Sequence, residues 1–432
     1  MIASILFIGF VLAMLIGVPV GVALAAAGSL AIALANFDVQ WWGLLAVPQN
    51  FYASLAKYPM LAVPMFVLVG SIFDRSGVAQ RLVTFAISIL GRGPGTLPVV
   101  AIAVAIFLGG ISGSGPANAA AVGGVMIAAM TRAGYPRPFS ASVVAAGAST
   151  DILIPPSVAF IIYSILVPQA TVPALFAAGM FPGLLAGAAL MVPAVWLARK
   201  HSMGHLESSL ARPPFWRSLG QASWGLAAPV LILGGMRMGW FTPTEAAVVA
   251  VFYGLFIGMV VHRTIGVRDL FVIFREAAEL SAVIMLVVAL AGIFAWSLST
   301  LSIIDPITTA IVESGLGEWG TMALVIALLI VLGMFLDGIS IFLIFVPLFL
   351  PIAQAFQWDL VWFGVIMTLM VAVGQFTPPL AVNLMVSCRI ANVSVEKTIP
   401  WVVWFVVAML FAMVVVVAYP PIALWLPARL GY

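Results

Sequence analysis

Charged residues and cysteines are scarce in this sequence of 432 residues. Only 7% of the residues are charged, whereas 64% are hydrophobic. Soluble domains carry about 25% charged residues, so this composition excludes an ordinary soluble domain and places the chain in a lipid bilayer. The single cysteine, Cys388, excludes a disulfide framework and a cysteine-based metal site. We interpret it as a small packed apolar side chain.

Alternation of apolar and polar residues at every second position is also missing, which excludes a transmembrane β-barrel. Apolar stretches of membrane-spanning length recur instead, so the sequence predicts an all-α polytopic membrane protein. The N-terminus lacks a basic segment ahead of its apolar run, and no cleavable signal peptide is expected. The net charge of +3 is no indication of nucleic-acid binding, because its meaning depends on its distribution across the membrane.

The apolar pattern predicts about ten crossings and two re-entrant hairpins. The hairpins are expected at 95–130 and 319–355, since each stretch has a polar interruption near its middle, GISGSGPAN and FLDGIS. Such a tip is tolerated at membrane depth only where it faces protein or a water-filled cavity. The crossings are expected at 2–17, 20–35, 59–73, 139–166, 174–198, 222–237, 245–261, 280–298, 360–388 and 400–426.

Arginine and lysine sort to one side if the N-terminus lies outside a bacterial inner membrane, as basic residues accumulate on the cytoplasmic side. This orientation leaves only Lys57, Arg237 and Arg429 outside and places both termini in the periplasm. The first hairpin then opens to the cytoplasm and the second to the periplasm. Trp41, Trp42, Trp240, Trp319 and Trp358 fall at the interfaces. The basic residues expected inside are Arg75, Arg81, Arg92, Arg132, Arg137, Arg199, Lys200, Arg212, Arg217, Arg263, Arg268, Arg275, Arg389 and Lys397.

An internal repeat is indicated by four landmarks that recur at a nearly constant separation. Each half has five crossings, an odd number, so the second copy is expected to be inverted. Inverted repeats with broken helices are typical of secondary transporters, whose sites lie at mid-membrane between the repeats. The matched positions are Pro19 with Pro243, the Ile-Phe pair at 72–73 with 293–294, Gly109 with Gly333, and the prolines at 155–156 with those at 378–379.

Polar breaks in otherwise apolar segments carry the candidate chemistry. The two double-proline segments, ASTDILIPPS and VGQFTPPLAVN, leave free carbonyls on preceding residues, because proline has no N–H. Such oxygens suit a hard cation such as sodium, while helix N-termini at the hairpin tips favour an anion. An isolated break of this kind usually serves only to kink or pack a helix, but four breaks that obey the repeat favour a binding site.

Two carboxylates at membrane depth, Asp151 and Asp337, mark either an ion path or a protonated packing residue. Glu245 is interpreted as a helix N-terminal cap. The run 199–217 is interpreted as a solvated cytoplasmic connector. His201, His205 and His262 all fall in cytoplasmic loops, so no base is available for an intramembrane serine protease built on Ser114. An ion channel would not require the paired broken helices.

Several motifs resemble those of the large membrane subunits of TRAP (tripartite ATP-independent periplasmic) transporters. The resemblance runs from about residue 5 to residue 425, and its motifs are more specific together than singly. They are MFVLVGSIFDRSGVAQRL at 65–82, ISGSGPANAAAVG at 111–123, ILIPPS at 152–157, FTPTEAA at 241–247 and TPPLAVNL at 377–384.

The resemblance implies a transporter rather than an enzyme, working by an elevator mechanism. It implies sodium as the coupling ion with no other cofactor, a small organic anion (carboxylate or sulfonate) as substrate, and contact with membrane lipid. The implied protein partners are a small four-helix membrane subunit and a periplasmic binding protein. A stand-alone sodium-coupled elevator carrier of the dicarboxylate or citrate type shares the architecture and remains the alternative.

The same resemblance divides the chain into a first repeat (1–198), a connector (199–221) and a second repeat (222–432). Scaffold helices are expected in 1–73 and 222–298. The transport domain would hold the hairpin and broken helix of each half, at 95–166 and 319–388, with a last helix at 400–426.

Candidate ligands follow from the family motifs. This chain departs from the family pattern at Asp151, where a small or apolar residue is usual. Arg389 is either a bidentate partner for a substrate carboxylate or a cytoplasmic anchor. The implied first sodium site is Ser112, Ser114, Asn118, Gly147, Ser149 and Pro155; the second is Asp337, Gly338, Ser340, Gly374, Thr377 and Pro379; the substrate site is Ser114, Asn118, Asp151, Asn383 and Arg389.

Overall fold

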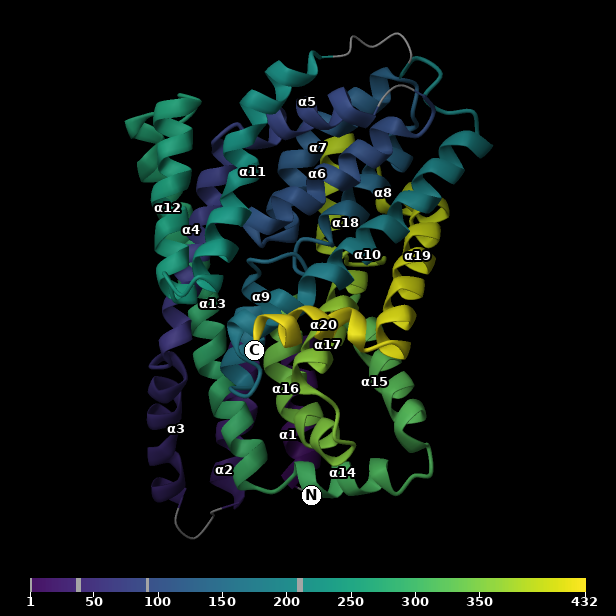
Figure 1. The fold of residues 1–432 in the computed structure, drawn as a ribbon. Helices are drawn as coiled ribbons and strands as arrows, with labels where there is room; N and C mark the ends of the chain where they lie inside the picture. The colour runs from purple at the N-terminus through teal and green to yellow at the C-terminus, as the bar shows by residue number, and fades with distance from the viewer. Residues whose placement is uncertain (1, 36–39, 91–92, 208–212) are drawn as a thin grey trace.

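The computed structural model describes the whole chain except residues 1, 36–39, 91–92 and 208–212. Arg92 and Arg212 and the side chains of Trp41, Trp42 and Ser112 therefore lie outside the described part. Every regular element within the described residues is a helix (Figure 1). The first half contains α1 (Ile2–Leu15), α2 (Val20–Ala35), α3 (Gln40–Leu55), α4 (Ala62–Arg75), α5 (Val78–Leu90), α6 (Thr96–Ser112), α7 (Gly115–Arg132), α8 (Arg137–Ala148), α9 (Val158–Leu166) and α10 (Val172–Lys200).

The second half contains a similar series. Seven helical segments of the described chain are long and apolar enough to cross a membrane, and several shorter apolar helices accompany them. The all-α polytopic prediction is thus confirmed. The helices are α11 (Phe215–Arg237), α12 (Pro243–Leu255), α13 (Val267–Thr300), α14 (Ile304–Val312), α15 (Gly317–Gly333), α16 (Gly338–Ala355), α17 (Leu360–Gly374), α18 (Val382–Ala391), α19 (Ile399–Ala418) and α20 (Pro421–Leu430).

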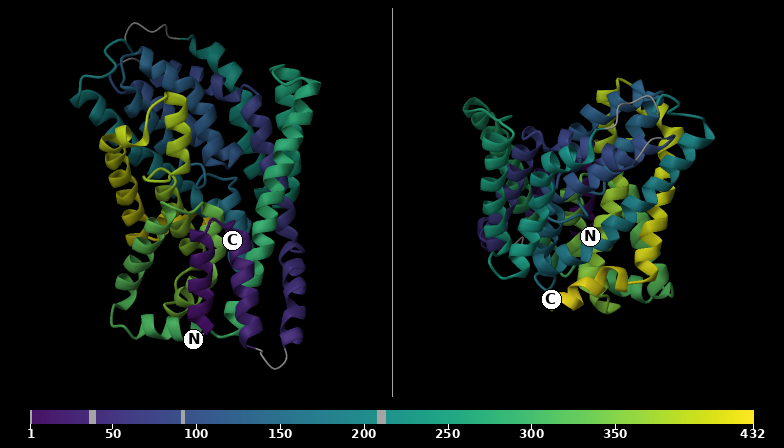
Figure 2. Two further views of the ribbon diagram at one scale, coloured as in Figure 1. Left: turned by 180° about the vertical axis from the view of Figure 1, so that it is seen from behind. Right: turned by 45° about the horizontal axis from the view of Figure 1, so that its top comes forward.

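Two helical hairpins enter the molecule from opposite ends. In Figure 1 the α6–α7 hairpin descends from the top and the α15–α16 hairpin rises from the bottom, and the reversed view in Figure 2 keeps the same arrangement. Each hairpin packs against the interrupted helix that follows it: α6 and α7 against α8, and α15 and α16 against α17. The hairpins and the double-proline breaks therefore form where the sequence predicts them.

The interrupted helices occupy the centre of the molecule. In α17, every residue from Trp362 to Gly374 is buried, and in α8 the same holds from Phe139 to Ala148. Helices that are apolar around their whole circumference are buried on all sides. A second group of helices packs to one side, where α13 contacts α2, α3 and α4, and α12 contacts α4.

Local signals explain several helix ends. Thr242 and Glu245 form a capping box at the start of α12, with the Thr242 N–H donating to Glu245 Oε2 over 2.8 Å, which confirms the cap expected for Glu245. The expected single helix at 400–426 is wrong. It is divided into α19 and α20 at Tyr419, because Pro420 and Pro421 cannot donate to the helical ladder.

Three other expectations need correction. No helix was expected at α3 or α5, since Pro48 interrupts the apolar run of the first, and polar residues such as Gln80 and Arg81 interrupt the second. The connector is not simply solvated in its described part. Met203 and Glu207 are buried, and the Leu206 N–H donates to the Ala133 carbonyl over 3.3 Å.

Candidate functional site

A cavity of about 320 Å³ lies where both hairpin tips meet both interrupted helices. Gly113 to Ala117 line it from the first hairpin, and Gly333 and Phe335 to Ile339 line it from the second. The interrupted helices add Ile152 and Gln375, among others. The remaining wall comes from α4 and α13, so segments from all parts of the sequence enclose one space.

The first interruption separates α8 from α9. Pro155 and Pro156 lie within it, joined by a cis peptide bond. The Ser149 hydroxyl donates to the Ala146 carbonyl over 2.7 Å, and its oxygen retains acceptor capacity. The tip of the first hairpin runs alongside, since a β-carbon at Gly110 would lie 3.2 Å from the Pro155 carbonyl oxygen. The tip and the first break are therefore neighbours.

The second interruption separates α17 from α18 in a similar way. Pro378 and Pro379 are joined by a cis peptide bond. The Thr377 hydroxyl donates to the Val373 carbonyl over 2.5 Å. A β-carbon at Gly338, on the second hairpin, would lie 3.6 Å from Gln375 Nε2. The structure thus brings the second hairpin tip beside the second break.

The second helices of the two hairpins, α7 and α16, differ in their N-terminal caps. Asp337 caps α16, with its Oδ2 accepting the N–H groups of Ile339 (3.1 Å) and Ser340 (3.2 Å), and its Oδ1 accepting the Ser340 hydroxyl. Ser114 occupies the capping position of α7, but its side chain makes no capping hydrogen bond. The N–H groups at the start of α7 border the cavity without a side-chain cap.

The first tip also reaches the second interrupted helix. A β-carbon at Gly115 would lie 2.7 Å from the Asn383 amide and from Gln375 Oε1, so any larger residue would displace these two side chains. Asn383 Nδ2 donates to Gln375 Oε1 over 3.2 Å, and Asn118 Nδ2 donates to the Ala105 carbonyl over 2.8 Å. Both asparagine Oδ1 atoms are buried without a partner. Buried acceptors in this state are available to a cation or a donor group.

The remaining predicted substrate residues lie away from the cavity wall. Arg389 is exposed near the end of α18, and no lysine or arginine is among the described residues that line the cavity. Asp151 is fully buried and does not line the cavity, although its neighbour Ile152 does. Ser114 is the only member of the predicted substrate set among the described lining residues.

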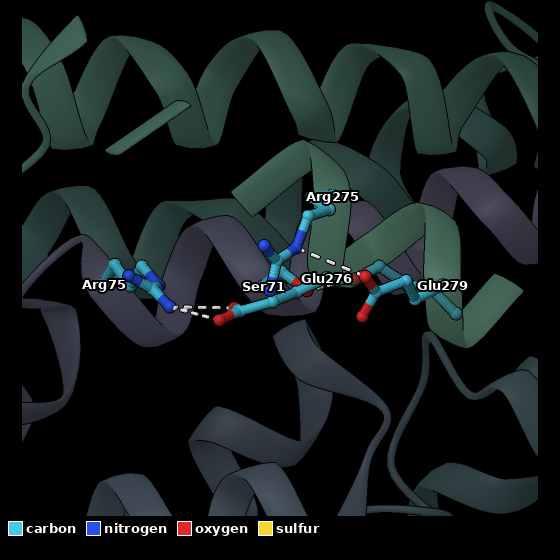
Figure 3. Close-up of polar contacts among 6 residues, drawn as sticks. Ser71, Arg75, Arg275, Glu276 and Glu279 are labelled. Atoms are coloured by element: carbon cyan, nitrogen blue, oxygen red, sulfur yellow. Dashed lines mark hydrogen bonds and ion pairs between the residues drawn. The ribbon is translucent and has the colours of Figure 1, made fainter. Parts of the chain in front are cut away.

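Several lining residues escaped the sequence analysis. They include Ser71 and Asp74 on α4 and Gln375 beside the second break. Ser71 lies four residues before Arg75 on α4, and Arg75 forms an ion pair with Glu276 on α13 (Figure 3), with Nη2 and Oε1 2.7 Å apart. Ser71 and Asp74 fall within the family motif at 65–82, and Gln375 precedes a double proline, so motif position was the one available signal.

A multi-pass helical protein whose central cavity is enclosed by two hairpins and two interrupted helices is a membrane transporter. Solved structures have the same fold. The YdaH transporter of Alcanivorax borkumensis superposes with a TM-score of 0.58 at 12% identity, covering 98% of each chain. MtrF of Neisseria gonorrhoeae gives 0.55 at 12% identity, covering 86% of this chain and 83% of that one.

The sequence then defines the family. Residues 7–422 match the Tripartite ATP-independent periplasmic transporter, DctM component, and the chain belongs to this family of transporter permeases. It is 35% identical over 382 residues to the C4-dicarboxylate TRAP transporter large permease protein DctM of Pseudomonas aeruginosa, covering 88% of this chain and 89% of that protein.

Two further relatives are longer than this chain. The isethionate TRAP transporter permease protein DctMQ of Oleidesulfovibrio alaskensis is 34% identical over 422 residues, which are 96% of this chain and 65% of that protein. The sialic acid TRAP transporter permease protein SiaT of Haemophilus influenzae is 32% identical over 415 residues, which are 96% of this chain and 66% of that protein. The chain therefore spans about two thirds of the length of these two relatives.

Proposed function

We propose that this chain is the large permease subunit of a transporter that imports a small organic anion, a carboxylate or a sulfonate, driven by a sodium gradient. The observation that carries the proposal is the cavity at which both hairpin tips and both interrupted helices converge. The relatives support an acidic substrate, because their names include isethionate, C4-dicarboxylate and sialic acid.

An anion in this cavity has no basic side chain to meet among the described lining residues. The uncapped start of α7 offers N–H groups and the positive end of a helix dipole instead. The Ser114 hydroxyl and the Gln375 amide can add hydrogen bonds. We therefore assign the anionic group of the substrate to the first hairpin tip.

Sodium is compatible with the surrounding donor set, which is oxygen-rich, as hard cations prefer. The buried Oδ1 atoms of Asn118 and Asn383 lack partners, and each double proline withholds two N–H groups from preceding carbonyls. When bound, sodium would link uptake to its own gradient. The first site would use Ser112, Ser114, Asn118, Gly147, Ser149 and Pro155, and the second Asp337, Gly338, Ser340, Gly374, Thr377 and Pro379.

The division of the cavity wall favours an elevator mechanism. One side belongs to the hairpins and interrupted helices, and the other belongs to α4 and α13, which pack with α2, α3 and α12. The first group would carry the substrate across the membrane past the second. We further propose an inner-membrane location with both termini in the periplasm, and assembly with a small membrane subunit and a periplasmic binding protein.

Uptake by proteoliposomes tests this function. The chain, reconstituted together with the proposed small membrane subunit and periplasmic binding protein, should accumulate a labelled organic acid under an inward sodium gradient. Thr377→Ala and Ser149→Ala should each raise the sodium concentration needed for half-maximal uptake by about tenfold, because each removes a candidate ligand oxygen.

Unchanged sodium dependence in both variants would remove this assignment of the cation sites. Uptake that proceeds equally well without any binding protein would favour the stand-alone carrier.

A further inference from the structure

The two halves of the chain form matching contacts between a hairpin and an interrupted helix, but only one contact contains a carboxylate. In the second half, Gly333 meets Gly374, so that a β-carbon on Gly374 would lie 2.5 Å from the Gly333 carbonyl. In the first half, a β-carbon on Gly109 would lie 2.5 Å from the Asp151 Cα. Asp151 thus occupies the place that Gly374 fills in the second half.

The Asp151 side chain is fully buried and has no charged partner of opposite sign among the described residues. Its relative exposure is 0%, and neither Oδ1 nor Oδ2 has a hydrogen-bond partner of normal geometry, although the Ile152 N–H lies close to the carboxylate. The other carboxylate at the hairpins, Asp337, is already used by the start of α16, where it accepts from Ile339 and Ser340. Of these two carboxylates, only the one in the first half has both oxygens unassigned.

The backbone carbonyl of Asp151 also lacks a hydrogen-bond donor, unlike the carbonyl of Gly374. In a continuous helix its carbonyl would accept from residue 155, but Pro155 has no N–H. At Gly374 the carbonyl is satisfied, because it accepts the Thr377 N–H over 3.2 Å. Asp151 consequently presents a backbone oxygen without its helical donor, in addition to a carboxylate that accepts no hydrogen bond of normal geometry.

The electrostatic surroundings also favour a cation. A second carboxylate, Asp74, lies on the cavity wall. Arg75, next to Asp74, is paired with Glu276. A buried carboxylate without a partner costs several kcal/mol unless it is neutralised or paired, and a small cation with oxygen ligands would provide that pairing.

We propose that Asp151 is a sodium ligand, binding through its carboxylate and backbone carbonyl, and that it makes the first-half cation site the tighter of the two. The inference rests on the proposed function, since it assumes sodium as the coupling ion. The second-half site, with Gly374 in the equivalent place and Asp337 occupied as a cap, would bind its cation through largely neutral oxygens.

Direct binding measurements test the assignment without relying on transport. The purified permease with its small subunit would be titrated with sodium against a choline background, following radioactive sodium binding and the midpoint of thermal unfolding. Asp151→Asn keeps the size of the side chain and removes its charge, so the tighter sodium affinity should fall about tenfold or more. Asp305→Asn, the same change at an exposed position on α14, should leave it unaltered.

Asp151→Gly provides the second variant, because it copies the residue found at Gly374. It should weaken sodium binding at least as much as Asp151→Asn does. It also allows the proposal to be tested if Asp151→Asn does not fold. Wild-type sodium affinity in the folded variants would show that Asp151 is a protonated packing residue and would overturn the proposal. If the wild-type protein itself shows neither sodium binding nor sodium-driven uptake, the proposed function fails instead.

Discussion

The first and second halves share a plan but place their carboxylates at different points of it. In the first half, Ser114 stands at the hairpin tip and Asp151 at the interrupted helix. In the second half, Asp337 stands at the tip and Gly374 at the interrupted helix. An acidic residue at a helix N-terminus is stabilised by the N–H groups and the dipole, whereas the same residue inside a break has no such partner. The position of a carboxylate, rather than its presence, decides whether it is available to a cation.

The two hairpin tips also differ in how the first N–H groups of their second helices are used. The start of α16 is covered by Asp337, so its N–H groups are already engaged. The start of α7 has no side-chain cap and borders the cavity. Under the proposed function, the anionic group of the substrate would therefore bind at the first tip.

The shared plan predicts that the glycine contacts are equally intolerant in both halves. Gly374→Ala and Gly109→Ala should each lower the free energy of unfolding by about 3 kcal/mol, because the added methyl group would lie 2.5 Å from backbone atoms. Thermal unfolding of the purified protein measures the effect. Gly124→Ala is the matched control, since nothing lies within 4 Å of a β-carbon there.

If one glycine tolerated alanine and the other did not, the two contacts would not be equivalent. The matched positions in the two halves would then not be structurally equivalent. A loss of stability in Gly124→Ala would instead point to a general effect of alanine in these helices.

A smaller effect is expected from the cap that distinguishes the tips. Asp337→Ala should destabilise α16 by about 1 kcal/mol, because two N–H groups lose their acceptor. Asp337→Ser, which copies Ser114, should recover part of the loss. Thermal unfolding and half-maximal sodium concentrations of both variants would be compared. Equal stability of Asp337→Ala and wild type would contradict the capping role.

Local chemistry explains which parts of this site were predictable. Proline and glycine alter the backbone only within a few residues. The sequence therefore predicts directly the breaks at Pro155 and Pro378 and the glycine-rich tip at Gly113. The cavity wall is different. Ser71 on α4 and Leu280 on α13 belong to different halves of the sequence, and only tertiary packing brings them together.

The candidate ligands divide along the same line. The sequence predicted Asp151 and Arg389 as substrate residues, but neither is among the described residues that line the cavity. Burial and the absence of hydrogen-bond partners at Asp151 are properties of the fold. The role of Gln375, which lies beside both Gly115 and Gly338, depends on two hairpins that approach from opposite ends.

The two halves also differ at the open ends of the hairpins, where an aromatic side chain donates a hydrogen bond to a carboxylate. In the second half, Glu318 in the first turn of α15 accepts from Trp358 Nε1 over 3.1 Å. In the first half, Glu207 of the connector accepts from the hydroxyl of Tyr135 (2.9 Å) and the N–H of Leu97 (2.8 Å). Tyr135 and Trp358 are separated in sequence by the same offset as Asp151 and Gly374. Each hairpin thus has an aromatic donor bound to a carboxylate, but in the first half this carboxylate, Glu207, belongs to the connector rather than to the hairpin.

The smallest effect is expected from Glu207, which should make the stability of the protein depend on pH. Burial raises the pKa of Glu207 above its ordinary value of 4.5. The folded state then binds its proton more tightly than the unfolded state, so this contribution to stability is complete below pH 4.5 and is lost as the pH rises through the folded-state pKa. Glu207→Gln should remove that part of the pH dependence, while Glu318→Gln should preserve it. Thermal unfolding of both variants between about pH 4 and pH 8 provides the measurement, and a wild-type slope in Glu207→Gln would assign the pH dependence to another group.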